Sequence, residues 1–373
     1  MLVLVGSFVV LLVLGVPIAY SIGIASILTM LVSIMPVAAF TTIAQRMATG
    51  LDSFALLAIP FFILAGQLMN RGGIATRLID FAKVLVGPLP GGLAFVNIIA
   101  CMLFGAISGS AVAAASAIGG FMHPRMVKEG YDESFSAAVN ITSSTTGLII
   151  PPSNVLIVYS LAAGGASIGA LFLAGYVPGI LVGLMLMAVS GTFAFRNKYP
   201  TGGTTPIGEA LKKTLNALPS LFLLVVVIGG IVAGIFTATE ASAVAVLYTL
   251  VLALLYGEIN ARDLPDILLE TVATTAIVMI LIAVSTGMSW VMSYENIPQA
   301  VSAALLNISE NKIIVLLLIN LILLFVGIFM DMTPAVLIFT PIFLPVVTEL
   351  GMDPIHFGII MVLNLSIGLC TPP

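Results

Sequence analysis

Long apolar stretches recur from one end of this chain to the other, and they limit its fold more than any other feature. A helix that spans a bilayer needs roughly 20 apolar residues. The stretches that reach this length are 2–35, 54–70, 134–163, 168–195, 218–236, 241–257, 270–292 and 353–373. Only 8% of the 373 residues are charged, whereas a soluble domain carries about 25%. We therefore predict an all-α, polytopic protein whose surface faces the lipid bilayer.

Two further apolar stretches are interrupted near their middle. Residues 93–122 contain Ser108-Gly109-Ser110, and residues 313–348 contain Asp331-Met332-Thr333-Pro334. Each half has about 13 to 18 residues, which is short for a complete span but suits one arm of a hairpin that enters the membrane and returns. The sequence thus predicts two re-entrant helical hairpins.

The basic residues support this topology. With both ends of the first hairpin and the N-terminus in the cytoplasm, 10 of the 12 basic residues lie inside, as the positive-inside rule requires. These ten are Arg71, Arg77, Lys83, Arg125, Lys128, Arg196, Lys198, Lys212, Lys213 and Arg262. Arg46 and Lys312 lie outside. Because no basic residue precedes the apolar stretch 2–35, we expect a retained membrane helix there and not a signal peptide.

An internal repeat relates the two halves of the chain. Residues 124–152 align without a gap to residues 345–373, and each segment follows a predicted hairpin. The identical positions include Gly130 and Gly351, Asp132 and Asp353, Gly147 and Gly368, and the terminal Pro-Pro pairs. Since the charges place the hairpins on opposite sides of the membrane, we predict two inverted-topology repeats, the usual construction of secondary transporters.

The repeats predict the domain organisation. The first repeat covers 1–198, with scaffold helices in 1–70, an interfacial arm helix at 71–86, an inner hairpin at 92–124, a broken helix at 133–163 and a helix at 168–195. Residues 199–217 form a linker. The second repeat covers 218–373, with scaffold helices at 218–257 and 270–292, an arm helix at 297–310, an outer hairpin at 311–348 and a broken helix at 353–373. By symmetry we expect a further C-terminal helix beyond residue 373.

The broken helices indicate where ions bind. Proline has no N–H, so Pro151 and Pro152 leave the carbonyls of Gly147 and Leu148 without helical partners. Five consecutive hydroxyl residues, 142–146, precede this break. Such groups often bond only their own helix, but an unpaired carbonyl within a membrane is costly unless it meets water or an ion. Sodium prefers several oxygen ligands, which a hairpin tip and an unwound helix supply together.

The predicted sodium ligands therefore come from each tip and its neighbouring break. In the first repeat they are Ser108, Gly109, Ser110, Thr145, Gly147, Ile149 and Pro152. In the second they are Asp331, Met332, Thr333, Gly368, Cys370, Thr371 and Pro373. Asp331 is the most informative of these, because a carboxylate inside an apolar stretch is expensive and usually functional.

Three stretches resemble the large membrane subunit of the tripartite ATP-independent periplasmic (TRAP) transporters. They are Gly50–Phe54 continuing through Ala58–Phe62, Phe104–Ser110, and Gly147–Ser153. The resemblance extends over the whole chain. It implies an elevator-type sodium symporter in the bacterial inner membrane that takes up an acidic substrate, such as a C4-dicarboxylate or a sialic acid. It also implies two partners, a small four-helix membrane subunit and a periplasmic substrate-binding protein.

Candidate substrate residues follow from position. The notional mid-membrane region contains no Arg or Lys, so an anion must be held by hydroxyls, amides, helix N-termini and bound cations. The candidates are Asn140, Ser143, Ser144 and Asn154.

Several other functions fit the sequence less well. No phosphate-binding loop is present, so ion gradients are the expected energy source, and no basic patch indicates nucleic acid. Cys101 and Cys370 lie in apolar segments and indicate neither a disulfide nor a metal site. An intramembrane enzyme using Ser108 with His123 or His356 as base is disfavoured, because about 15 helical residues separate Ser108 from His123 and span roughly 22 Å. A channel is disfavoured because the polar groups cluster at two breaks. The nearest alternative is a sodium-coupled anion symporter that needs no binding protein.

Overall fold

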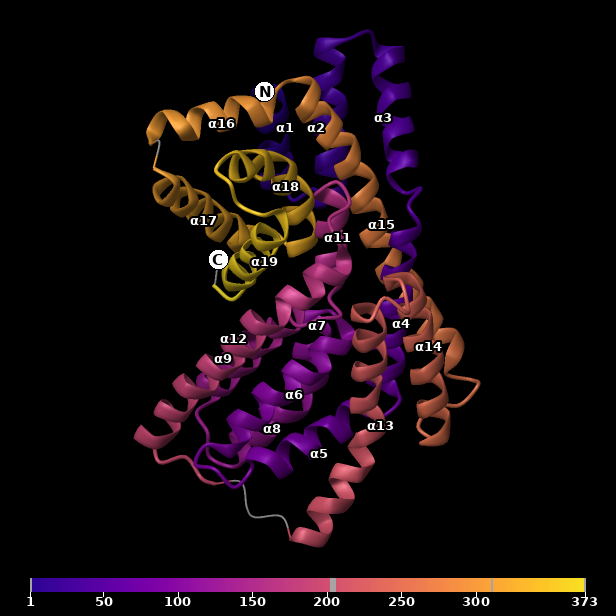
Figure 1. Cartoon of the computed structure of the whole chain (residues 1–373), viewed down its shortest axis with the longest axis vertical. Coiled ribbons are helices and arrows are strands. Elements are labelled where there is room, and N and C mark those ends of the chain that lie inside the picture. Colours follow the sequence, from indigo (N-terminus) through magenta and orange to yellow (C-terminus); the bar gives the residue numbers. More distant parts are fainter. Residues whose placement is uncertain (1, 202–205, 310, 372–373) are drawn as a thin grey trace. The chain divides into compact units, whose positions relative to one another are not determined.

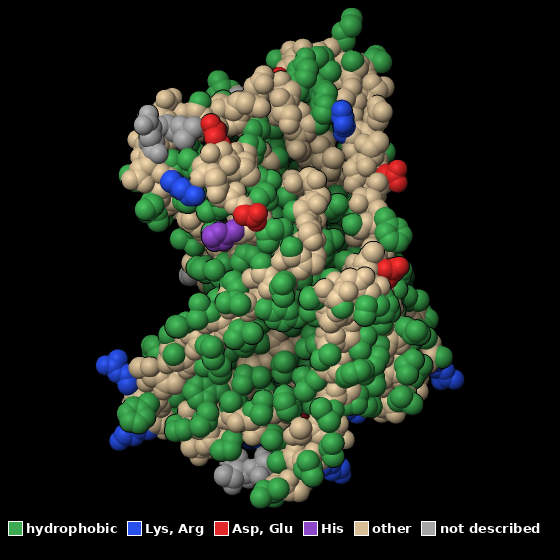
Figure 2. All heavy atoms as spheres, viewed as in Figure 1, with side chains coloured by type: hydrophobic (Ala, Val, Ile, Leu, Met, Phe, Trp, Pro, Cys, Tyr) green, Lys and Arg blue, Asp and Glu red, His purple; other side chains and the backbone are tan. Residues whose placement is uncertain are grey.

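The computed structural model describes residues 2–201, 206–309 and 311–371. Within these ranges the chain is almost entirely helical and its only β contact is an isolated bridge between Pro90 and Thr201. Seven of the described helices are long and apolar enough to cross a membrane, or eight if the pair Glu133–Ile149 and Asn154–Ala162 forms one broken span. The face drawn in Figure 2 is mainly hydrophobic with few charged side chains. These features confirm the predicted all-α, polytopic membrane protein.

The chain divides into two compact units (Figure 1). Unit 1 comprises Met1–Leu56, Ile157–Ser167 and Ala273–Pro373, and unit 2 comprises Leu57–Leu156 and Ile168–Val272. The chain passes from one unit to the other within helices α11 (Asn154–Ala162) and α15 (Leu264–Tyr294). The first hairpin lies in unit 2 and the second in unit 1, so each can be described separately.

Unit 2 holds most of the elements of the first repeat. Its remaining helices are α4 (Ala58–Arg71), α5 (Ile74–Val86), α6 (Gly92–Ser108), α7 (Ala111–Ala114), the π-helical η2 (Ala115–Gly119), α8 (Gly120–Lys128), α9 (Glu133–Ser144), α10 (Thr146–Ile149), α12 (Ile168–Arg196), α13 (Ile207–Val232) and α14 (Ala238–Leu255). A short 3₁₀ turn, η1 (Phe54–Leu57), precedes α4. Helix α6 packs against α5, α9, α10 and α12, so it is the centre of this unit.

Unit 1 holds the second hairpin. Its helices are α1 (Leu2–Val13), α2 (Ile18–Ser33), α3 (Pro36–Gly50), α16 (Ile297–Ile308), α17 (Lys312–Phe329), α18 (Met332–Glu349) and α19 (Pro354–Leu369), with the C-terminal part of α15. Helices α17, α18 and α19 pack together, as the yellow ribbons of Figure 1 show.

The apolar stretch 2–35 differs from the single helix that its length predicted. It forms α1 and α2, which pack against each other. The interruption has two local causes: Gly15 adopts a positive φ of 75°, and Pro17 cannot donate a helical hydrogen bond. Hydrophobicity alone could not reveal this, because the residues on both sides of the interruption remain apolar.

The internal repeat has the same local structure in both halves. Gly130 and Gly351 both adopt a positive φ, 92° and 76°, which favours glycine. Two residues later Asp132 and Asp353 cap the next helix, each accepting a backbone N–H at 2.8 Å. The aligned residues therefore end one hairpin arm and begin the broken helix in each repeat.

The predicted arm helix at 71–86 corresponds to α5. Its buried face contains Ile74, Leu78 and Ala82, whereas Leu85 is exposed. Its polar side is tied to neighbouring helices of unit 2. The Arg77 guanidinium lies 3.6 Å from the centre of the Tyr256 ring, and burial together with nearby Arg125 and Lys213 lowers the pKa of the Lys83 ammonium group.

The start of the predicted linker is fixed to the base of the first hairpin. The Tyr131 ring stacks on that of Tyr199 with centroids 4.5 Å apart, and the Tyr131 hydroxyl donates to the Pro200 carbonyl at 3.2 Å. Phe135 completes the cluster at 5.3 Å from Tyr199. Burial raises the pKa of Tyr131 to about 12.

Candidate functional site

The tip of the first hairpin lies directly on the break that follows α10. Gly109 ends α6 with a φ of 60°, a conformation that favours glycine. A Cβ at this position would meet the backbone N of Asn154 at 3.0 Å and the carbonyl oxygen of Pro152 at 3.2 Å. A side chain has no room here. The structure thus brings together the predicted tip residues and one predicted carbonyl ligand, that of Pro152.

A second glycine contact lies one turn before the tip. A Cβ added to Gly105 of α6 would stand only 2.5 Å from the Cα of Gly147 in α10. The two helices therefore touch backbone to backbone, which holds the hairpin against the broken helix. The predicted ligand Gly147 has this packing role, whatever its carbonyl binds.

The break itself is largely, but not completely, satisfied by hydrogen bonds. The peptide bond between Pro151 and Pro152 is cis, and α9–α10 and α11 meet at an angle of 49°. The Leu148 carbonyl, which the sequence predicted to lack a partner, accepts a hydrogen bond from the Ser153 hydroxyl at 2.6 Å. The sequence analysis missed this role of Ser153, although a hydroxyl five residues after Leu148 was the available signal.

Asn154 supplies an oxygen that has no partner within the described part of the chain. Its Oδ1 atom is buried and accepts no hydrogen bond there, and its Cγ would lie 3.3 Å from a Cβ on Gly109. A buried acceptor without a donor is costly and calls for an explanation. A cation beside the hairpin tip would satisfy it.

The hydroxyl run before the break bonds mainly to its own helix. Ser144, Thr145 and Thr146 donate to the carbonyls of Ile141, Thr142 and Ser143 at 2.8, 2.8 and 2.6 Å. A hydroxyl that donates its hydrogen inward keeps lone pairs available for a cation. These contacts are the ordinary structural role of hydroxyls in membrane helices.

The other predicted residues of the first repeat lie in packing contacts. Ser143 is buried against α6, where it accepts a hydrogen bond from Asn97 at 2.9 Å. Asn140 donates to the Ala115 carbonyl at 3.1 Å, at the start of the π-helical segment of the second arm. The Ile149 carbonyl lies 2.5 Å from where a Cβ on Gly175 of α12 would stand.

The second repeat has the same framework in unit 1. A Cβ on Gly368 of α19 would lie 2.8 Å from the Cα of Gly327 in α17, which matches the first glycine contact. Asp331 precedes α18 and is exposed, whereas Met332 is buried at the start of that helix, beside Thr333. The Thr371 hydroxyl donates to the Gly368 carbonyl at 2.6 Å. The Cys370 thiol contacts the Ser366 carbonyl at 3.4 Å, and Pro373 lies outside the described residues.

Comparison with known proteins decides the family. The model of the tripartite ATP-independent periplasmic transporter, DctM component, matches residues 5–373. This chain belongs to that family.

Several relatives span nearly the whole chain. Uncharacterized protein YgiK of Salmonella typhimurium is 57% identical over 372 residues, which cover 100% of this chain and 86% of the relative. The C4-dicarboxylate TRAP transporter large permease protein DctM of Pseudomonas aeruginosa is 44% identical, covering 86% of this chain and 75% of its own. The sialic acid TRAP transporter large permease protein SiaM of Vibrio cholerae is 42% identical, with shares of 88% and 77%.

Two solved transporters share the fold at low sequence identity. The YdaH transporter of Alcanivorax borkumensis has a TM-score of 0.60 at 15% identity and covers 89% of this chain and 76% of its own. MtrF of Neisseria gonorrhoeae has a TM-score of 0.62 at 12% identity, and the match covers 90% of this chain and 74% of MtrF. These two structures show the fold alone; the family match and the relatives named as permeases identify this chain as a transporter subunit and not an enzyme.

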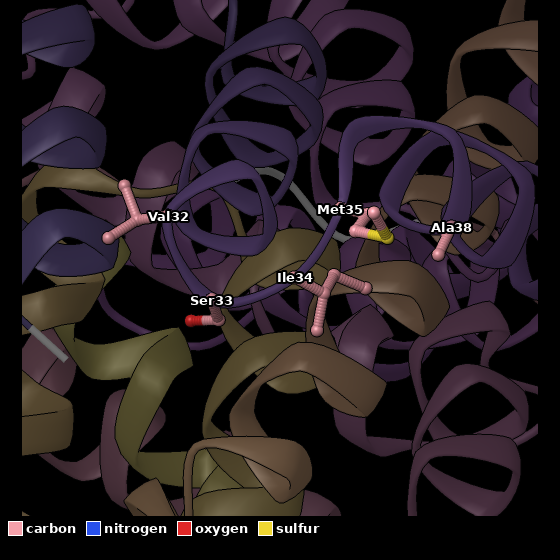
Figure 3. A pocket seen from close by; sticks show the side chains of 5 residues that line it. All are labelled: Val32, Ser33, Ile34, Met35 and Ala38. Atoms are coloured by element: carbon pink, nitrogen blue, oxygen red, sulfur yellow. The ribbon is translucent and has the colours of Figure 1, made fainter.

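In the described part of the TRAP permease chain, three cavities are lined by residues other than the predicted substrate residues. An open hollow of about 620 Å³ lies at the turn between α2 and α3 and is lined by Val32, Ser33, Ile34, Met35 and Ala38 (Figure 3). A cavity of about 10 Å³ borders Pro152 in unit 2, and its other lining residues are apolar. This space is close to that of one water molecule, so it is too small for an organic anion.

Proposed function

We propose that this TRAP large permease catalyses sodium-coupled uptake of a small organic anion across the bacterial inner membrane, with an elevator-type motion and its N-terminus in the cytoplasm. Sodium ions bind at the two hairpin tips. The observation that carries the proposal is the contact between the Gly109 tip and the Pro152–Asn154 break, where the buried Asn154 oxygen has no hydrogen-bond partner among the described residues. The Pro152 carbonyl oxygen and the Asn154 side-chain amide both lie against the tip residue Gly109.

The substrate class is inferred from chemistry that the relatives share. The names of related permeases refer to C4-dicarboxylates, sialic acid, isethionate and 2,3-diketo-L-gulonate, and each of these compounds carries an acidic group. Bound sodium would offset the negative charge of such a substrate where no lysine or arginine is available. Asn140, Ser143, Ser144 and Asn154 remain the proposed substrate region, with Asn154 close enough to the tip to link substrate and ion binding.

We further propose two protein partners, a small membrane subunit and a periplasmic substrate-binding protein. A relative from Oleidesulfovibrio alaskensis, named an isethionate TRAP transporter permease protein DctMQ, is 41% identical and is covered to 58% of its length by this chain. Its additional length is consistent with a permease that carries a second membrane component.

Dependence on the binding protein distinguishes this proposal from a stand-alone sodium symporter. We expect proteoliposomes containing both membrane subunits and a sodium gradient to accumulate substrate only when the cognate binding protein is added outside. The measurement is radiolabelled uptake with and without that protein, with the binding protein of an unrelated transporter as control. Equal uptake without any binding protein would favour the stand-alone symporter.

Loss of tip hydroxyls is expected to weaken sodium binding only in part, because backbone carbonyls remain. Ser108→Ala or Thr333→Ala should raise the sodium concentration for half-maximal uptake by about threefold to tenfold, roughly the value of one hydrogen-bonding or ligand group. Sodium titrations of uptake measure this, and Thr192→Ala is a control because Thr192 donates only within α12. Unchanged sodium curves for both tip variants would remove the tips from the ion site.

A further inference from the structure

A buried asparagine joins the first hairpin arm to the broken helix in unit 2. The Asn97 side chain of α6 is fully buried, and its Nδ2 donates to the Ser143 hydroxyl of α9 at 2.9 Å. Asn97 lies eight residues before Gly105, and Ser143 lies four residues before Gly147. The hydrogen bond and the glycine contact therefore follow one another along the same pair of elements, leading to the hairpin tip.

The second repeat builds the same connection with different residues. In unit 1 the Nδ2 of Asn364 in α19 donates to the Oδ1 of Asn320 in α17 at 2.6 Å. Asn364 is the residue that aligns with Ser143, and it lies four residues before Gly368. Asn320 lies seven residues before Gly327. In both repeats, therefore, the polar bridge lies on the first hairpin arm about two helical turns before the glycine contact.

The glycine contact and the polar bridge do different physical work. Touching glycine backbones allow close approach, but they offer no directional bond that would resist sliding of one helix along the other. A slip of one residue moves a helix by about 1.5 Å along its axis, whereas an ion site needs its ligands held to within about 0.5 Å. A directional hydrogen bond supplies the missing constraint, as a single buried asparagine does for the register of a coiled coil.

The unpaired side-chain oxygens of the bridging asparagines indicate that these residues set the helix register and do not add stability. The Oδ1 atoms of Asn97 and Asn364 are buried and have no hydrogen-bond partner within the described part of the chain. A buried acceptor left unpaired destabilises the protein, so an apolar pair would pack more favourably at either position. An amide in each bridge nevertheless retains this cost, and in both bridges its nitrogen is used to connect the two helices.

We propose that Asn97 and Asn320 are positioning residues that fix the register of each hairpin against its broken helix and so set the affinity for sodium. This inference rests on the proposed sodium coupling. It assigns Ser143 to the bridge, in addition to its place among the candidate substrate residues. Asn97 and Asn320 act through the tip residues and touch neither ion nor substrate.

The test is a double-mutant cycle on the full-length chain in lipid nanodiscs. The variants are Asn97→Ala, Ser143→Ala and the double variant, and Thr142→Ala is the matched control because Thr142 donates to the Ala138 carbonyl in its own helix. The melting temperature is followed against sodium chloride, with choline chloride holding the ionic strength constant. Amide hydrogen exchange of residues 106–113 is measured in parallel.

We expect each single variant to raise the sodium concentration for half-maximal thermal stabilisation by about fivefold or more. The sodium midpoint of the double variant should be no higher than that of the more affected single variant, because the two single substitutions remove the same bond. Exchange at the tip should accelerate in these variants and remain unchanged in Thr142→Ala. Asn364→Ala should act likewise in the second repeat, with Ser366→Ala, whose hydroxyl donates to the Val362 carbonyl, as its control.

The proposal is overturned if the sodium midpoints and the exchange rates at the tip stay at the wild-type values. It is also overturned if the effects of the two single substitutions add completely in the double variant. If Asn97→Ala does not fold, Ser143→Ala tests the same bond by removing one hydroxyl. If sodium does not stabilise even the wild-type protein, the proposed sodium coupling fails. Amide exchange at the tip then tests the bridge alone: if the bridge fixes the register, exchange is faster in Ser143→Ala than in Thr142→Ala.

Discussion

Replacing Gly105 with alanine is expected to reduce substrate uptake by more than about tenfold. The new methyl group would stand 2.5 Å from the Cα of Gly147, and backbone atoms cannot move aside as a flexible side chain can. Overpacking of this kind costs about 1–3 kcal/mol in the free energy of unfolding. It also pushes the hairpin tip away from the Pro152–Asn154 break. Initial uptake rates at saturating sodium, corrected for the amount of protein inserted, measure the effect.

The second repeat provides an independent version of this experiment. Gly368→Ala should cause a comparable loss, because its Cβ would lie 2.8 Å from the Cα of Gly327. Two controls separate packing from glycine flexibility. Gly120→Ala meets nothing within 4 Å in α8, and Gly287→Ala meets Ile43 at an ordinary 3.5 Å; both should transport normally. Wild-type uptake in Gly105→Ala and Gly368→Ala would show that the hairpins do not need close contact with the broken helices.

Much of this architecture could be predicted from the sequence because lipid imposes strict rules. Apolar length indicates spans, and the alignment of Gly130 and Asp132 with Gly351 and Asp353 identified equivalent positions that have the same backbone conformation and the same cap. The tips were located by small and polar residues inside apolar stretches. Their contact with the breaks was a hypothesis based on unpaired carbonyls, and the position of Gly109 against Pro152 agrees with it.

Other features depend on tertiary contacts that a single sequence does not reveal. The interruption between α1 and α2 is an exception with local causes, Gly15 and Pro17, which hydrophobicity alone does not reveal. The partner of the Leu148 carbonyl, Ser153, lies beyond the two prolines, where the sequence analysis assigned it no role. Asn97 and Asn320 were overlooked because a lone amide in an apolar helix gives no indication of its partner. Only their similar distances from Gly105 and Gly327, eight and seven residues, compared across the two repeats, could have identified them.

The most direct measurement of the central claim is uptake under a controlled sodium gradient. Proteoliposomes with both membrane subunits and the cognate binding protein are compared with an inward gradient, with equal sodium on both sides, and with sodium replaced by choline. ATP is present throughout, and Gly105→Ala serves as an inactive reference. We expect accumulation against a substrate gradient only with inward sodium, and none when ionophore collapses that gradient. If substrate still accumulates without sodium, whether or not ATP drives it, uptake is not coupled to sodium.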